Sequence, residues 1–105
     1  MEQPSSGPLD ELWDLVVRIP RGKVISYGVL GACLSSPVSG YQVGRAMARC
    51  KAPVPWWRVV AKTGMLPIGK RDQRLGMEQR ERLAEEGVTF EDGLIVRSCF
   101  LDEIP

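Results

Sequence analysis

Two short apolar segments separated by a brief turn constrain the fold of this chain more than any other feature. The first begins after Ser26, a residue type that caps helices, and continues through residues 27–34. The turn at residues 35–40 holds three serines, a proline and a glycine, and the second segment, residues 41–50, carries its apolar side chains at helical spacing. Two helices of this length joined by so short a turn are typical of a helix-turn-helix. The sequence therefore predicts a DNA-binding fold.

The sequence around this pair predicts one domain, residues 9–105, behind a loose tail at residues 1–8. Apolar side chains at helical spacing predict a helix before the pair, and short β-branched or alternating stretches after it predict strands. The expected fold class is mainly α: a winged helix-turn-helix domain with a short β-wing and a small C-terminal hairpin. The further elements predicted are a helix over residues 9–17, a wing with strands at 58–61 and 65–66, a basic loop at 67–75, a helix over 77–86 stopped by Gly87, and a hairpin of 88–90 with 94–96.

The charges of the chain are divided unevenly along it, although the net charge is only +1. Residues 41–82 hold ten Lys and Arg against three Asp and Glu, a local net of +7, and the remainder carries a net of −6. Arg45 and Arg49 lie opposite the apolar side of the predicted third helix. Such a chain can present a basic face to phosphates, or its two halves can neutralise each other within the fold. Both interpretations stay open on charge alone.

Histidine is missing from the chain, and this absence narrows the possible chemistry. Cys33, Cys50 and Cys99 form no C-x-x-C pair, which argues against a zinc site or a disulfide scaffold. Without histidine, neither a serine nor a cysteine can be activated in the commonest way. The absence also removes the commonest general base and most metal sites, so we expect no metal and no catalytic residue that depends on histidine. The sequence also lacks a long apolar run and a secretion signal, so we expect a cytoplasmic protein with no membrane contact.

The segment Val54-Pro55-Trp56-Trp57-Arg58-Val59-Val60 is the most unusual stretch of the chain. Adjacent side chains in extended structure point to opposite sides, so the two tryptophans are not expected to share one core. One of them is expected to line a surface or pocket, with plain core packing as the alternative. Aromatic faces beside arginines can hold an unstacked base by stacking and cation–π contact.

Roughly residues 9–90 resemble the DNA-binding domain of the O⁶-alkylguanine-DNA alkyltransferases. Active family members carry Pro-Cys-His-Arg-Val, where the cysteine accepts the alkyl group and the histidine helps to deprotonate it. Here Trp56 and Trp57 stand at those two positions, so the chain resembles the alkyltransferase-like proteins. The matching pieces, in order, are residues 19–28, 42–47 and 54–60, Thr63-Gly64, Lys70-Arg71-Asp72, and residues 82–87.

The resemblance implies a non-enzymatic DNA damage sensor. Such a protein binds O⁶-alkylguanine in duplex DNA, flips the nucleotide and marks it for nucleotide excision repair. The expected partners are double-stranded DNA containing alkylated guanine and the nucleotide excision repair proteins, with no cofactor. The lesion-binding pocket implied by the resemblance comprises Tyr27 at the DNA backbone, Trp56 as a wall, Arg58 as a DNA contact or a support, Val59, and Arg71 as a cover over the base.

The recognition helix departs from the family pattern at one position. Where the family has an arginine that fills the gap left by the flipped base, this chain has Tyr41. Tyr41 can act as an aromatic wedge, Arg45 one turn later can contribute, or flipping can be weaker, and all three possibilities stay open. The DNA-binding residues expected on this helix and directly after it are Tyr41, Gln42, Arg45, Arg49 and Lys51.

Two other functions compete with the damage sensor. One is an alkyltransferase with a displaced acceptor such as Cys50, although Cys50 falls on the apolar side of a helix and has no histidine to activate it. The other is a winged-helix transcription regulator that reads sequence. Such regulators usually dimerise to read two half-sites, and the sequence predicts no dimerisation helix, so we expect a monomer.

Overall fold

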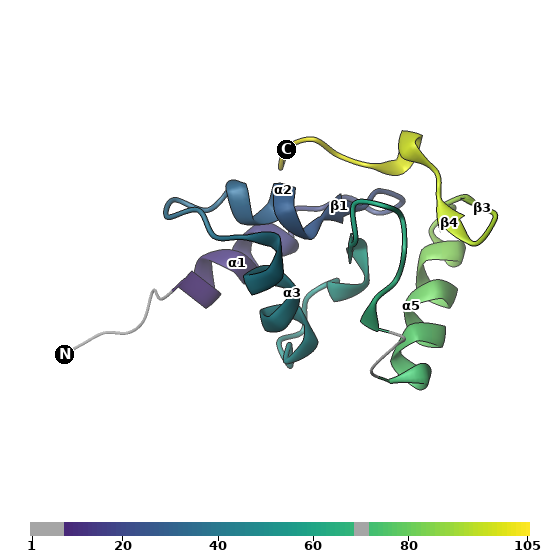
Figure 1. Ribbon diagram of the computed structural model, residues 1–105, viewed down its shortest axis with the longest axis horizontal. Coiled ribbons are helices and arrows are strands. Elements are labelled where there is room, and N and C mark those ends of the chain that lie inside the picture. Colours follow the sequence, from purple (N-terminus) through teal and green to yellow (C-terminus); the bar gives the residue numbers. More distant parts are fainter. Residues whose placement is uncertain (1–7, 69–71) are drawn as a thin grey trace.

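The computed structural model describes residues 8–68 and 72–105, and these form a mainly helical domain with short strands (Figure 1). The predicted tail therefore falls almost entirely outside the described residues, as do Lys70 and Arg71 of the predicted basic loop. The helices and strands are α1 (Pro8–Val16), β1 (Ile25–Ser26), α2 (Tyr27–Ala32), α3 (Gly40–Ala48), β2 (Val59–Val60), α5 (Gln73–Glu85), β3 (Phe90–Glu91) and β4 (Leu94–Ile95), with single turns of 3-10 helix at Trp56–Arg58 and Arg97–Cys99.

The helix-turn-helix is present, and both of its helices are capped by serine side chains. Ser26 Oγ accepts a hydrogen bond from Val29 N at 3.2 Å, as the sequence predicts. Ser39 caps α3 in a reciprocal pair: its Oγ accepts from Gln42 N, while Gln42 Oε1 accepts from Ser39 N at 3.1 Å. Because of this cap, α3 begins at Gly40, one residue earlier than predicted.

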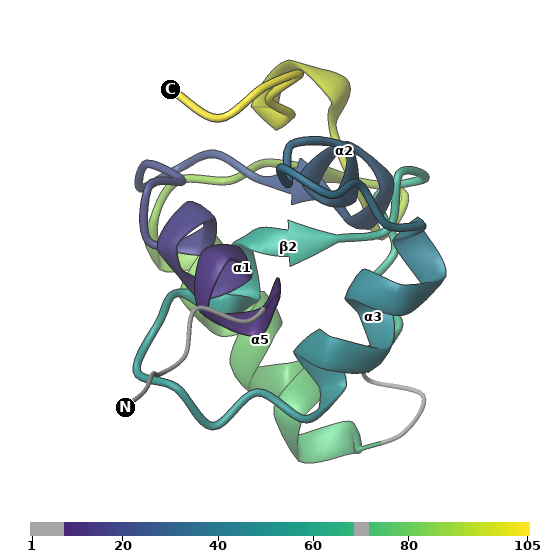
Figure 2. The ribbon, with the colours of Figure 1, turned by 90° about the vertical axis from the view of Figure 1, so that its left-hand side faces the viewer.

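The two helices of the motif approach each other closely at glycines. A Cβ on Gly40 would lie 3.0 Å from Gly28 N, and one on Gly31 would collide with Val38 O and lie 3.0 Å from Val43 Cγ2. Small residues at these positions therefore set the distance between α2 and α3, which Figure 2 shows from the side.

Replacing Gly31 with alanine is expected to lower the free energy of unfolding by about 1–3 kcal/mol, the usual range for overpacking. The new methyl group meets backbone and a buried valine, neither of which can move freely. Gly28→Ala, in the same helix, provides the control because nothing lies within 4 Å of its Cβ position. Urea unfolding should show a lower midpoint for Gly31→Ala only, and equal midpoints would contradict this account of the helix pair.

The predicted β-wing, in which residues 58–61 would pair with residues 65–66, is wrong. β2 does form, but it pairs in parallel with β1, with Ile25 opposite Val59 and Ser26 opposite Val60. Val59 and Val60 are both fully buried, so this strand belongs to the interior and does not project as one arm of a hairpin. Residues 65–66 form no strand, and of the expected pairing there remains the hydrogen bond from Ala61 N to Met65 O.

The C-terminal part follows the sequence prediction more closely. α5 begins at Gln73, four residues before the predicted start, because Asp72 accepts hydrogen bonds from the backbone N–H groups of residues 74 and 75. It ends before Gly87, whose φ of +90° is the predicted stop. The closing hairpin is confirmed: β3 and β4 pair antiparallel around Asp92 and Gly93, both at positive φ.

Two hydrophobic clusters hold these elements together on either side of the β1–β2 pair. The first cluster includes Leu12, Leu30, Val43 and Val59 and joins α1, α2 and α3. The second includes Val60 and Leu83 and joins α5 with the C-terminal segment, residues 88–99. The helix-turn-helix therefore stands on one half of the molecule and α5 on the other (Figure 1).

Candidate nucleic-acid interface

A hollow of about 450 Å³ opens between the helix-turn-helix and the chain that follows β2. We call it the α2–α3 hollow. One side is formed by both helices of the motif and the other by mostly apolar side chains on the way to α5. Its lining consists of residues 26–28, Gly40, Tyr41, Gly44, Arg45 and Ala48, together with residues 61–62 and 67–68.

Tyr27, the first residue of α2, lies half-buried in this lining. Burial raises the pKa of Tyr27 to about 12, so the phenol keeps its proton throughout the physiological range. A protonated hydroxyl in such a position can donate a hydrogen bond to an anionic group at the mouth of the hollow.

Tyr41 stands at the start of α3 and is 73% exposed, the most exposed large hydrophobic side chain among the described residues. The Arg45 guanidinium carbon lies 5.8 Å from the centre of its ring. Part of the hydrogen-bonding capacity of the Gln42 side chain is already used, because its Oε1 accepts a hydrogen bond from Ser39 N in the helix cap. An exposed aromatic ring with an arginine beside it is available to stack on a base.

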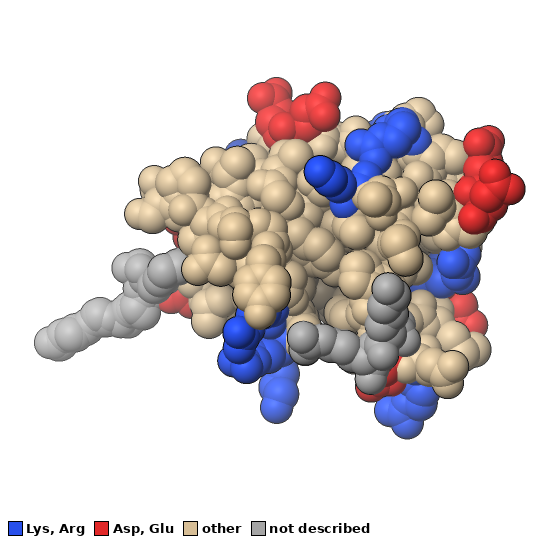
Figure 3. All heavy atoms as spheres, in the orientation of Figure 1, with Lys and Arg blue, Asp and Glu red and all other residues tan. Residues whose placement is uncertain are grey.

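The predicted DNA-binding cations remain free for an external partner. Arg45, Arg49, Lys51 and Lys62 are exposed, and none forms an ion pair with another described residue. Figure 3 shows Lys and Arg side chains at the lower end of α3, with others at the upper edge and on the α5 side, and Asp and Glu side chains at the β3–β4 hairpin and at the upper edge. Part of the uneven charge is neutralised within the fold, notably at Arg58, while the cations at the end of α3 stay exposed.

Residues 54–60, which we call the tryptophan segment, contain the predicted pocket residues Trp56, Arg58 and Val59. None of these three lines the α2–α3 hollow. Trp56, Trp57 and Arg58 line another hollow, of about 560 Å³, together with Val17, residues 52–55 and Arg82. Trp56 packs against the first hydrophobic cluster and Trp57 against the second, with their rings 5.9 Å apart and nearly perpendicular. The two side chains do pack against different clusters, as expected, but not for the predicted reason, because residues 56–58 form a turn of 3-10 helix and not extended chain. Val59 is 1% exposed and belongs to the first cluster.

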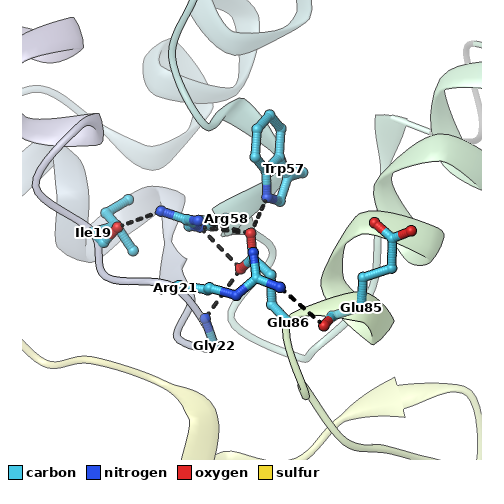
Figure 4. A network of polar contacts seen from close by, with 7 residues as sticks. All are labelled: Ile19, Arg21, Gly22, Trp57, Arg58, Glu85 and Glu86. Carbon is cyan, nitrogen blue, oxygen red and sulfur yellow. Dashed lines mark hydrogen bonds and ion pairs between the residues drawn. The ribbon is translucent and has the colours of Figure 1, made fainter.

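Glu86 is the functional residue that the sequence reasoning missed (Figure 4). Its side chain is 4% exposed, and its carboxylate accepts hydrogen bonds from Arg58 Nε at 3.0 Å and Nη2 at 2.7 Å, from Trp57 Nε1 at 2.8 Å and from Gly22 N at 3.1 Å. Arg58 Nη1 also donates to Ile19 O at 2.7 Å. Of the two roles left open for Arg58, this geometry favours support of the site over contact with DNA.

The pKa of Glu86 lies below its ordinary value despite burial. Desolvation by itself would raise this pKa, but the hydrogen bonds from Arg58, Gly22 and Trp57 and the charge of Arg58 outweigh it. The carboxylate is therefore ionised at neutral pH and fixes the tryptophan segment to the end of α5 and to residues 19–22.

Cys50, the candidate displaced acceptor, lies in an environment that disfavours the thiolate. Burial raises the pKa of the Cys50 thiol, an effect opposed only by the contact from its Sγ to Ala52 O at 3.7 Å. Within residues 8–68 and 72–105, no group of three potential metal ligands comes together. In the same part of the chain, no helix has the length and apolar character needed to cross a membrane.

Comparison with known proteins gives consistent matches over most of the chain. Residues 9–88 match the family model described as 6-O-methylguanine DNA methyltransferase, DNA binding domain. The chain is 41% identical to alkyltransferase-like protein 1 of Schizosaccharomyces pombe over 81 residues, which cover 74% of this chain and 73% of that protein. It is 34% identical to the DNA base-flipping protein of Escherichia coli over 90 residues, covering 84% and 67% of the two chains.

A solved structure shows the same fold. The crystal structure of S. pombe Atl1 in complex with damaged DNA containing O6-carboxymethylguanine superposes with a TM-score of 0.69 at 35% identity, covering 85% of this chain and 83% of that one. The helical arrangement described above is therefore similar to that of a protein solved on damaged DNA.

Proposed function

The chain belongs to the family of the 6-O-methylguanine DNA methyltransferase DNA-binding domain, in its alkyltransferase-like branch, and on this premise we propose that it is a non-enzymatic sensor of alkylated guanine in duplex DNA. The observation that carries the proposal is the α2–α3 hollow with the exposed ring of Tyr41 at its edge. A base turned out of the stack needs a pocket, and the stack it leaves needs a side chain to refill it.

The α2–α3 hollow suits a flipped base in size and lining. Its volume of about 450 Å³ falls within the range of small-ligand pockets, about 300–1,000 Å³. Pro67 and Ile68 offer apolar surface to the base, and Tyr27 can donate to a phosphate of the rotated nucleotide. Arg71, outside the described residues, keeps the role of covering the base that the resemblance gives it.

The exposed cations supply the sequence-independent part of binding. Arg45 on α3, Arg49 at its C-cap and Lys51 shortly after can neutralise phosphates on either side of the lesion. Trp56 and Val59 support the helix pair through the first hydrophobic cluster, and Arg58 is held in place by Glu86. Since binding alone leaves the lesion in place, the proposal includes hand-over to nucleotide excision repair proteins, and a monomeric, cytoplasmic protein remains our prediction.

A gel-shift series tests the proposal directly. The parent protein is titrated with a duplex holding one O⁶-methylguanine and with its undamaged twin, at the same stated salt concentration. We expect clearly tighter binding of the damaged duplex. Equal affinities for the damaged duplex and its undamaged twin would overturn the sensor, and strong preference for one undamaged sequence over others would favour a transcription regulator.

The protein mass is expected to remain unchanged after incubation with the methylated duplex. Trp56 and Trp57 stand where active relatives carry the acceptor and its base, and the thiol of Cys50 is disfavoured as a thiolate. Trp56→Cys alone is expected to give no efficient transfer, because no histidine activates the new thiol. Mass spectrometry checks both proteins, and a methyl adduct on any cysteine of the parent would contradict the non-enzymatic function.

A further inference from the structure

A second hollow, of about 530 Å³, lies on the opposite flank of α3, between this helix and α1. We call it the α1–α3 hollow; Figure 2 shows the two helices that bound it. α1 contributes Leu9 and Trp13, and α3 contributes, among others, Tyr41 and Arg45. Arg49 follows as the C-cap, because α3 ends at Ala48 and not at the predicted residue 50. The proposed function uses Tyr41, Arg45 and Arg49 of this lining, but it assigns no role to Leu9 and Trp13 and does not say which DNA strand the hollow faces.

The lining of the α1–α3 hollow has the chemistry of a sugar–phosphate backbone site. Leu9 is 53% exposed although it is apolar, and Trp13 is half-buried beside it. Trp13 lines the hollow and brings to it an indole N–H, which can only donate a hydrogen bond. Apolar surface suits the deoxyribose, while an indole N–H and two guanidinium groups suit the phosphates.

Tyr41 and Arg45 line both hollows and therefore form a ridge between them. A helix that enters a groove of duplex DNA faces one strand on each of its flanks, because the groove is bounded by the two backbones. If the damaged base enters the α2–α3 hollow, the strand that carries it lies along that flank of α3. The undamaged strand then lies along the other flank.

We propose that the α1–α3 hollow binds the sugar–phosphate backbone of the strand opposite the lesion, with Trp13 and Arg49 as its contacts. This inference rests on the proposed function, since the flipped base fixes which strand lies on which side. It extends the interface to α1, where no DNA contact is predicted from the sequence, and it makes the ridge of Tyr41 and Arg45 the element that separates the two strands.

The test couples Arg49→Ala to uncharged methylphosphonate linkages placed near the lesion in one strand or the other. With natural damaged duplex, Arg49→Ala should weaken binding severalfold and lower the salt slope by about one. With methylphosphonates in the opposite strand this loss should disappear, and with methylphosphonates in the damaged strand it should persist in full. Lys23→Ala, an exposed cation that lines neither hollow, controls for general charge effects.

Trp13→Phe provides an independent measurement, because it keeps an aromatic ring in place but removes the N–H donor. Its loss of affinity should likewise disappear only with methylphosphonates in the opposite strand. The inference would be overturned if methylphosphonates in the damaged strand, or in neither strand, abolished the affinity losses of both variants. In that case the preference of the parent protein for damaged duplex could still hold. Loss of that preference in the parent protein would instead overturn the proposed function, and the strand assignment with it.

Discussion

Glu86→Ala is expected to lower the free energy of unfolding by about 3–5 kcal/mol, the largest stability effect predicted here. The substitution leaves the Arg58 guanidinium, whose side chain is 13% exposed, without its carboxylate partner, and it leaves the N–H groups of Trp57 and Gly22 unpaired. A buried charge without a counter-charge costs far more than the pair contributes. For a domain with a total stability of about 5–15 kcal/mol, such a loss brings it close to unfolding.

Glu85→Ala is the matched control, because the side chain of Glu85 points away from this network (Figure 4) and only its backbone carbonyl accepts a bond, from Arg21. Urea unfolding should give nearly the parent value for Glu85→Ala and an intermediate loss for Glu86→Gln, which keeps the shape but not the charge. Equal losses for Glu85→Ala and Glu86→Ala would contradict the assigned role of the carboxylate.

The same network predicts a pH dependence. The folded-state pKa of Glu86 lies below its ordinary value of 4.5, so its contribution to stability is present above pH 4.5 and is lost as the pH falls through the folded-state pKa. The difference in stability between the parent and Glu86→Ala should therefore be full at neutral pH and should shrink in acid. A difference that stays constant to low pH would show that the charge of Glu86 does not carry the effect.

Local signals explain which parts of the fold could be predicted from the sequence. The cap at Ser26 and the stop at Gly87 act within one helical turn, so a linear pattern contains them in full. Two further N-caps are also local sequence patterns. Ser39-x-x-Gln42 is the capping box of α3, and Asp72 is the N-cap of α5, so both helix starts can be predicted from the sequence. The exposure of Arg45 and Arg49 followed from helical periodicity alone.

Long-range pairing explains what the sequence did not predict. Val59 and Val60 could belong equally well to an exposed wing or to an interior strand. They form an interior strand because β1, distant in the sequence, pairs with them. Glu86 becomes a site residue because three distant segments meet at its carboxylate. Likewise, the resemblance gave Trp56 a place on the pocket wall, whereas the side chains that line the α2–α3 hollow after β2 come from residues 61–62 and 67–68.

Tyr41→Ala is expected to weaken binding of the damaged duplex by about 1–3 kcal/mol, roughly fivefold to 150-fold in affinity. Turning a guanine out of the duplex leaves a gap in the stack, and a side chain that fills it recovers part of the few kcal/mol spent on unstacking. Tyr41 is placed to do so, because its ring is 73% exposed at the ridge between the two hollows. The same exposure means that its removal should cost little folding stability.

Tyr41→Phe is the conservative control and should bind nearly as tightly as the parent, because stacking needs the ring and not the hydroxyl. Tyr41→Arg should bind equally well or better, since a guanidinium can stack and also bond to the orphaned cytosine. With 2-aminopurine beside the lesion, the parent should give a fluorescence rise on binding that Tyr41→Ala reduces. If Tyr41→Ala binds as tightly as the parent with the same rise, Tyr41 does not fill the gap. Arg45, whose guanidinium lies 5.8 Å from that ring, would then be the side chain to replace, because it is the other member of the ridge.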